Sequence, residues 1–200
     1  MNQKRRIAVL FAVLFLLSVA VFAAFSKYIK DIPVEGTVTF HADLADSIEL
    51  VESKAQKDPY NGSYFLTAAE TNSNEYVLLP GLDVPKDPKI RIEGKSDIPA
   101  YLYVEVFSTL PTTVTYSLTS RWIDLGLVGP NGGKIYGYDT ELDGSVENFT
   151  VSILQNDMLY VSDQLKRSTQ GTLTFYAYMA QKVGATDQAD TFTGTFMPVP

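Results

Sequence analysis

The chain has 200 residues, of which 46% are hydrophobic; it contains no cysteine and one histidine, and its formal net charge is -7. This length is enough for one domain with a sizeable core, and the lack of cysteine excludes disulfides, thiolate metal sites and cysteine nucleophiles. Because an acidic chain repels nucleic acid and anionic lipid, we expect no nucleic-acid partner.

The beginning of the chain has the pattern of a secretory signal. Residues 4–6 are basic, and residues 7–25 follow without a single charge. Val21 and Ala23 supply the modest side chains that a signal peptidase accepts at the -3 and -1 positions. We therefore predict export, with cleavage by signal peptidase between Ala23 and Ala24.

The same apolar run allows a second interpretation, an uncleaved membrane anchor. Residues 7–25 are just long enough to cross a bilayer of about 30 Å, and the basic residues before them would stay in the cytoplasm. In both cases the rest of the chain is exported, and it meets the membrane only through residues 7–25.

Cleavage removes three basic residues and leaves 13 basic and 23 acidic side chains. A cysteine-free exported domain of this kind indicates a Gram-positive bacterium, because small secreted animal domains usually carry disulfides.

The clearest strand pattern beyond the signal lies in residues 101–107, where Leu102 and Val104 fall on one face. Residues 89–93 and 172–180 alternate in the same way. A period of two, with β-branched and aromatic residues, predicts half-buried strands. Weaker strand patterns cover residues 35–40, 47–52, 75–79, 114–118, 134–138, 149–154 and 158–162.

About ten short strands, separated by turn signals such as Asn61-Gly62 and Pro80-Gly81, predict an all-β fold. The absence of alternating helices favours an antiparallel β-sandwich, and we expect a jelly-roll-like form. Residues 185–190 predict a single helical turn. The predicted organisation is a secretory signal over residues 1–23, an N-terminal extension over 24–33 and one β-sandwich domain over 34–200.

The single histidine limits the catalytic chemistry that this chain can carry. His41 lies close to Asp43 and Asp46, so it could join a triad or a cation site, but we interpret it as an exposed residue at a strand end. A zinc-protease motif needs two histidines on one helix. The sequence therefore predicts no catalytic residue, no metal ligand and no cofactor, and hence no enzyme.

Two further groups of residues could serve a site, and both have a structural explanation. The loop acids could form a glycosidase carboxylate pair, but we interpret them as solvated turn residues: Asp83, Asp87, Asp139, Glu141 and Asp143. Trp122 and the tyrosine-rich runs could form a ligand platform, but aromatic residues on strands more often pack in the core.

Several short motifs together resemble the TasA/camelysin family of exported proteins in Gram-positive bacteria. Residues 22–26 (Phe-Ala-Ala-Phe-Ser) resemble the end of the family's signal, and residues 79–88 (Leu-Pro-Gly-Leu-Asp-Val-Pro-Lys-Asp-Pro) resemble its proline-rich segment. The aromatic strand at 101–107 follows that segment, as in small members of the family. Residues 122–126 and 174–181 extend the resemblance.

The resemblance implies a jelly-roll-like sandwich that is secreted and self-associates into fibres of the biofilm matrix or cell surface. The alternative is a non-enzymatic, adhesin-like domain that binds a glycan or a host surface. Residues Phe25, Tyr28 and Ile32 are candidates to set the register of a strand donated to another subunit. An ordinary first strand, paired within its own domain, is an equally good interpretation of this segment.

Overall fold

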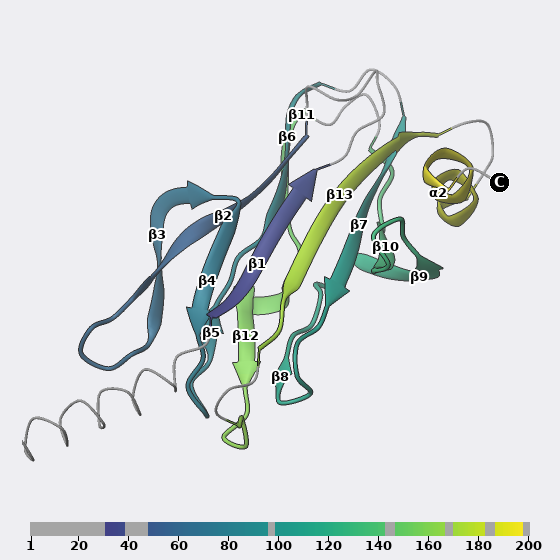
Figure 1. Cartoon of the computed structure of the whole chain (residues 1–200). Coiled ribbons are helices and arrows are strands. Elements are labelled where there is room, and N and C mark those ends of the chain that lie inside the picture. The colour runs from purple at the N-terminus through teal and green to yellow at the C-terminus, as the bar shows by residue number, and fades with distance from the viewer. Residues whose placement is uncertain are drawn as a thin grey trace, which may run out of the picture.

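A computed structural model (Figure 1) describes residues 31–38, 48–95, 99–142, 147–166, 170–182 and 187–197. Residues 31–38, 94, 95 and 147 are described by their backbone alone. The described residues form thirteen strands, one 3-10 turn and one α-helix. The prediction of an all-β antiparallel sandwich is confirmed. The structure adds strands at Tyr64–Thr71, Val84–Pro85 and Trp122–Val128, which the sequence patterns did not predict.

The larger sheet has six strands in the order β4-β1-β13-β7-β10-β9. All neighbours in it run antiparallel except β1 and β13, which pair in parallel. Its strands are β1 (Asp31–Val38), β4 (Ser73–Val77), β7 (Ala100–Ser108), β9 (Trp122–Val128), β10 (Lys134–Tyr138) and β13 (Leu173–Gln181).

The second sheet has four antiparallel strands in the order β11-β6-β2-β3, and a third sheet is made of the short strands β5, β12 and β8. The chain crosses repeatedly between the two larger sheets, as in jelly-roll-like sandwiches. The bounds are β2 (Ile48–Lys57), β3 (Tyr64–Thr71), β5 (Val84–Pro85), β6 (Lys89–Lys95), β8 (Val114–Thr115), β11 (Glu147–Ser152) and β12 (Met158–Val161), with the 3-10 turn η2 at Gln155–Asp157.

The main core lies between the two larger sheets. Ile90 and Ile92 of β6 face Leu102 and Val104 of β7 in one buried cluster, as their alternation predicts. Trp122 is buried in the same cluster, and its indole N–H donates to the carbonyl of Ser152 at 3.0 Å. Trp122 is thus a core residue and not a ligand platform.

The central strands β7 and β13 are buried on both faces, which their alternation did not predict. A second cluster on the outer face joins Tyr103 of β7 and Tyr178 of β13 to Phe192 of the helix α2 (Gln188–Phe196). Asp187 caps this helix by accepting a hydrogen bond of 2.8 Å from the amide of Asp190. The helix is longer than the single turn expected, because Phe192 and Phe196 pack on the tyrosines of the sheet.

Candidate functional site

Most residues of the predicted processing and donation sites lie outside the described residues: Val21, Ala23, Ala24, Phe25 and Tyr28, together with His41. Ile32 is described as part of β1, where it pairs with Tyr76 of β4 in an antiparallel register. Further along, at residues 36–38, β1 pairs in parallel with β13 on its other side. The backbone around Ile32 is therefore engaged within its own chain, and donation by the segment before it stays a prediction.

Strand β9 forms an open edge of the larger sheet. It pairs with β10 on one side, and no strand of the described chain pairs with its other side. Ile123 and Val128 of β9 are 51% and 60% exposed, although both are apolar. An edge strand with exposed apolar side chains is a template for pairing with another chain. Gly126, at a φ of 69°, interrupts this edge midway.

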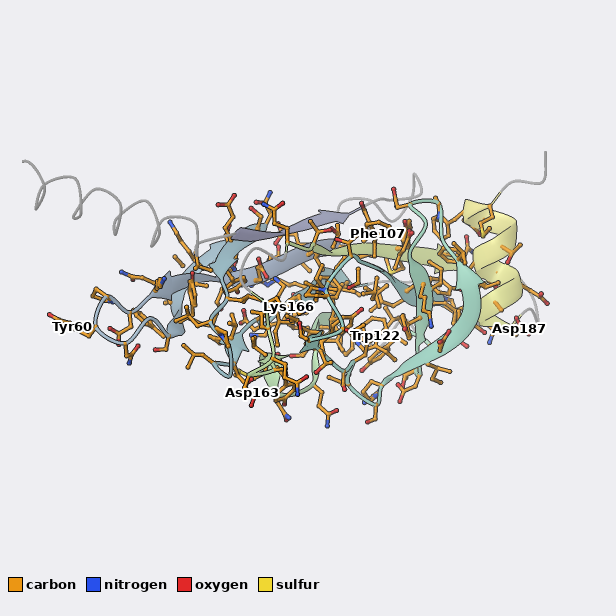
Figure 2. All side chains as sticks on the ribbon, turned by 60° about the horizontal axis from the view of Figure 1, so that its bottom comes forward. Tyr60, Phe107, Trp122, Asp163, Lys166 and Asp187 are labelled. Carbon is orange, nitrogen blue, oxygen red and sulfur yellow. The ribbon has the colours of Figure 1, made fainter. Side chains whose placement is uncertain are left out.

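A hairpin formed by β2 and β3 projects from the body of the sandwich, at the end opposite to α2 (Figure 1). Tyr60 in its turn is 96% exposed, and Figure 2 shows it at one end of the described part of the chain, with Asp187 at the other end. The turn is held by its own polar groups: Asp58 accepts from the amide of Tyr60 at 2.8 Å, and Asn61 accepts from the amide of Ser63 at 2.8 Å. The hairpin therefore exposes an aromatic ring on a turn that is stabilised by its own hydrogen bonds.

Most of the loop acids form structural contacts. Asp83 accepts from the amide of Val161 at 2.9 Å, Asp139 pairs with Arg121 and Glu141 pairs with Lys182. Asp143 lies outside the described residues. Within the described ranges, no three histidine, cysteine or acidic side chains are placed to share a metal ion.

Asp87 corrects the expectation of a solvated turn acid, because its side chain is buried. One carboxylate oxygen accepts from the amide of Ser53, and the other accepts from the Ser53 hydroxyl and from Lys89, each at 2.8 Å. Burial raises the pKa of Asp87, but the hydrogen bonds from Lys89 and Ser53 outweigh it and hold that pKa below its ordinary value. Asp87 thereby continues the ladder of β2 where its pairing with β6 ends.

Lys86 is a fully buried lysine in this acidic protein, with 0% of its side chain exposed. Its Nζ atom donates a hydrogen bond to the side chain of Glu52 on β2. Burial lowers the pKa of Lys86 and raises that of Glu52, because each charged form is poorly solvated in the core. The other carboxylate oxygen of Glu52 has no hydrogen-bond partner in the described part of the chain.

A third buried carboxylate, that of Glu105 in β7, lies against the loop between β9 and β10. It accepts from the amides of Asn131 and Gly133 at 2.9 and 2.8 Å, and from the Tyr178 hydroxyl at 2.5 Å. Burial, followed by the hydrogen bond to Glu105, raises the pKa of Tyr178. Four donor groups, with the side-chain amide of Asn131 included, hold this carboxylate.

The sequence did not reveal the two groups of buried polar residues, one around Lys86 and Glu52 and the other around Glu105. Lys86 and Asp87 lie in a polar, proline-flanked stretch, which has the pattern of an exposed loop. Glu105 interrupts an alternating apolar strand at an outward-facing position, and that is the one signal that could have marked it.

Among the described residues, no helix has the length and hydropathy needed to span a membrane. No known protein-family model matches the chain, and a search of curated proteins finds no match. The open edge of β9, the projecting hairpin and the sequence patterns carry the functional proposal.

Proposed function

We propose that this chain is a secreted structural protein of the bacterial cell surface or biofilm matrix, whose copies associate into fibres. The open edge of β9 is the observation that carries the proposal. No strand of the described chain pairs with its outer side, and its exposed apolar residues Ile123 and Val128 would be buried by a strand added there. A neighbouring subunit gains main-chain hydrogen bonds along such an edge, each contributing about 0.5–1.5 kcal/mol net.

The segment before β1 is the strand that we propose for this edge. Residues 24–30 directly precede β1 and become the free N-terminus after cleavage at Ala23. Phe25 and Tyr28 supply apolar side chains that can be buried in a neighbouring subunit, which fixes the register of an added strand. The role of Ile32 is then to anchor the donated segment to its own sheet, since it lies in β1.

The proposed family and location rest on the sequence. The resemblance to the TasA/camelysin family, the signal pattern at residues 1–23 and the lack of cysteine all support a Gram-positive, extracellular protein. The proposal includes no chemical reaction and no cofactor.

The test compares chains that begin at Ala24 and at Asp31. The shorter chain keeps all of β1, whereas a start at Val34 would remove three of the five residue pairs between β1 and β4. We expect fibres in electron microscopy and light scattering from the Ala24 chain, and a folded monomer from the Asp31 chain. Fibres of equal yield from both chains would contradict donation by residues 24–30.

A second pair of variants tests the acceptor edge. Ile123→Lys places a charge on β9, whereas Thr112→Lys adds the same charge at an exposed turn outside the sheet edges. We expect the first substitution to abolish fibres of the Ala24 chain and the second to leave them intact. Equal fibre formation by both variants would exclude the β9 edge as the contact.

The adhesin-like alternative is favoured by one observation, the exposed ring of Tyr60 at the tip of the β2–β3 hairpin. Tyrosine is common at binding hot spots, because it gives a large contact at little conformational cost. In this alternative, Tyr60→Ser abolishes binding of the protein to glycan arrays or host-cell surfaces and leaves self-association unchanged. Retained surface binding by Tyr60→Ser would exclude the hairpin as the adhesive site.

A further inference from the structure

The pair formed by Lys86 and Glu52 has an unusual setting for two charged residues. The Lys86 side chain is 0% exposed, and its nitrogen lies 5.9 Å from the ring centroid of Tyr76 and 6.0 Å from that of Phe175. Both rings are buried, so water is kept away from the contact between amine and carboxyl. Removing one charge from water costs several kcal/mol.

The polar groups around the pair do not satisfy all of the hydrogen-bonding capacity of Glu52. Glu52 receives a hydrogen bond from Lys86 on one oxygen, and its other oxygen has no hydrogen-bond partner among the described residues. The side chain of the nearby Asn74 accepts from the amide of Ala55 at 2.7 Å and donates to the carbonyl of Ser53 at 2.8 Å. Its amide also opposes the rise in the pKa of Glu52, but burial outweighs it. Asp87 is likewise occupied by Ser53 and Lys89.

The directions of the pKa shifts in the pair favour chemistry between the two groups. Burial shifts the pKa of Glu52 upward and that of Lys86 downward, so both shifts favour a neutral carboxylic acid beside a neutral amine. A neutral amine is a nucleophile, and a neutral carboxyl group is a far better electrophile than a carboxylate. Two such groups held in contact react as if at very high concentration.

We propose that Lys86 and Glu52 join in an intramolecular amide crosslink. The Nζ atom of Lys86 attacks Cδ of Glu52, so that an N–C bond forms and one C–O bond of the acid breaks. One proton from the amine and the hydroxyl group of the acid leave together as water, and no oxidant, metal or cofactor is required. The product is a neutral secondary amide, which removes both charges from the core.

The crosslink would tie together two elements that are 34 residues apart in the chain. Glu52 lies in β2, and Lys86 lies between β5 and β6. Closing a loop of this size covalently lowers the entropy of the unfolded chain. In a chain without cysteine, an amide bond supplies the covalent link that a disulfide gives to other secreted domains.

The test is intact-mass spectrometry of the denatured full-length protein, compared with the mass calculated for the N-terminus that it carries. We expect the wild type to be lighter by the mass of one water molecule, and fragmentation to yield a branched peptide that contains both residues. Lys86→Met should have its full calculated mass. The double variant Lys86→Met/Glu52→Leu is the folding control, because it replaces the pair by apolar residues of similar size.

Three results would overturn the crosslink. The first is a wild type with its full calculated mass after folding. The second is a loss of ammonia instead of water, which would point to reaction at Asn74. The third is a loss of water that persists in Lys86→Met, which would place the dehydration elsewhere in the chain. A gel under denaturing conditions gives a separate readout, because the looped wild type should migrate ahead of both variants.

Discussion

The amide of Gly133 donates a hydrogen bond of 2.8 Å to the buried carboxylate of Glu105. This contact ties the loop between β9 and β10 to the central strand β7, and Asn131 and Tyr178 complete the ring of donors. The outermost strand β9 is thus positioned by a carboxylate in the middle of the sheet.

Replacement of Glu105 by glutamine tests the carboxylate itself. Glutamine has nearly the same size as glutamate, but its NH₂ group cannot accept a hydrogen bond. In Glu105→Gln, part of the donors that surround the carboxylate therefore lose their acceptor. We expect the free energy of unfolding to fall by about 1.5–3 kcal/mol, the range for a lost hydrogen bond to a charged group. Urea unfolding measures the change. Glu93→Gln on exposed strand surface is the control and should stay within about 0.5 kcal/mol of wild type; equal effects of both would contradict the role of Glu105.

Gly133 is required by the close approach of the loop to β7. A Cβ atom at this position would lie 2.8 Å from the backbone of Val106 and 2.8 Å from the side chain of Glu105. We expect Gly133→Ala to destabilise the protein by about 1–3 kcal/mol, the usual cost of overpacking. Gly194→Ala in α2 is the matched control: a Cβ atom there would meet nothing within 4 Å beyond its own helix, and alanine should stabilise the helix by about 0.5–1 kcal/mol. Thermal unfolding of the two variants should therefore shift in opposite directions.

Asp87 should make stability depend on acid pH. Its folded-state pKa is lowered by the hydrogen bonds from Lys89 and Ser53, which outweigh the opposing effect of burial. An acid with a lowered pKa stabilises the fold above its unfolded-state pKa of about 3.9, and this contribution is lost as the pH falls through the folded-state pKa. The difference in unfolding free energy between wild type and Asp87→Asn should thus be constant near neutral pH and shrink in acid. A difference that does not change with pH would exclude the linkage.

Phe192 anchors α2 to the outer face of the sheet. Its ring is buried and lies 5.1 Å from that of Tyr103 and 5.5 Å from that of Tyr178, measured between centroids. We expect Phe192→Ala to cost about 3–5 kcal/mol, and to reduce the helical signal in circular dichroism, because α2 is too short to persist without packing. Thr193→Ala changes an exposed neighbour in the same helix and should leave both signals close to those of wild type.

The alternation of apolar and polar residues determined the fold class. It also determined which face of each central strand lies against the main core. Leu102 and Val104 face the main core as their period of two predicts, and the polar turns separate the strands as expected. Local patterns succeed here because strand periodicity and turn chemistry act over only a few residues.

Tertiary structure alone decided which polar residues are buried. Residues 86 and 87 have the local pattern of an exposed loop, yet packing against β2 places Lys86 beside Glu52 and Asp87 beside Ser53. Likewise, Glu105 is buried only because the loop carrying Gly133, and the ring of Tyr178, come to it from distant parts of the chain. Glu105 and its partners Gly133 and Tyr178 are 28 and 73 residues apart in the chain. The periodicity of a single strand cannot predict such contacts, because the burial of a side chain depends on which distant segments pack against it in the folded chain.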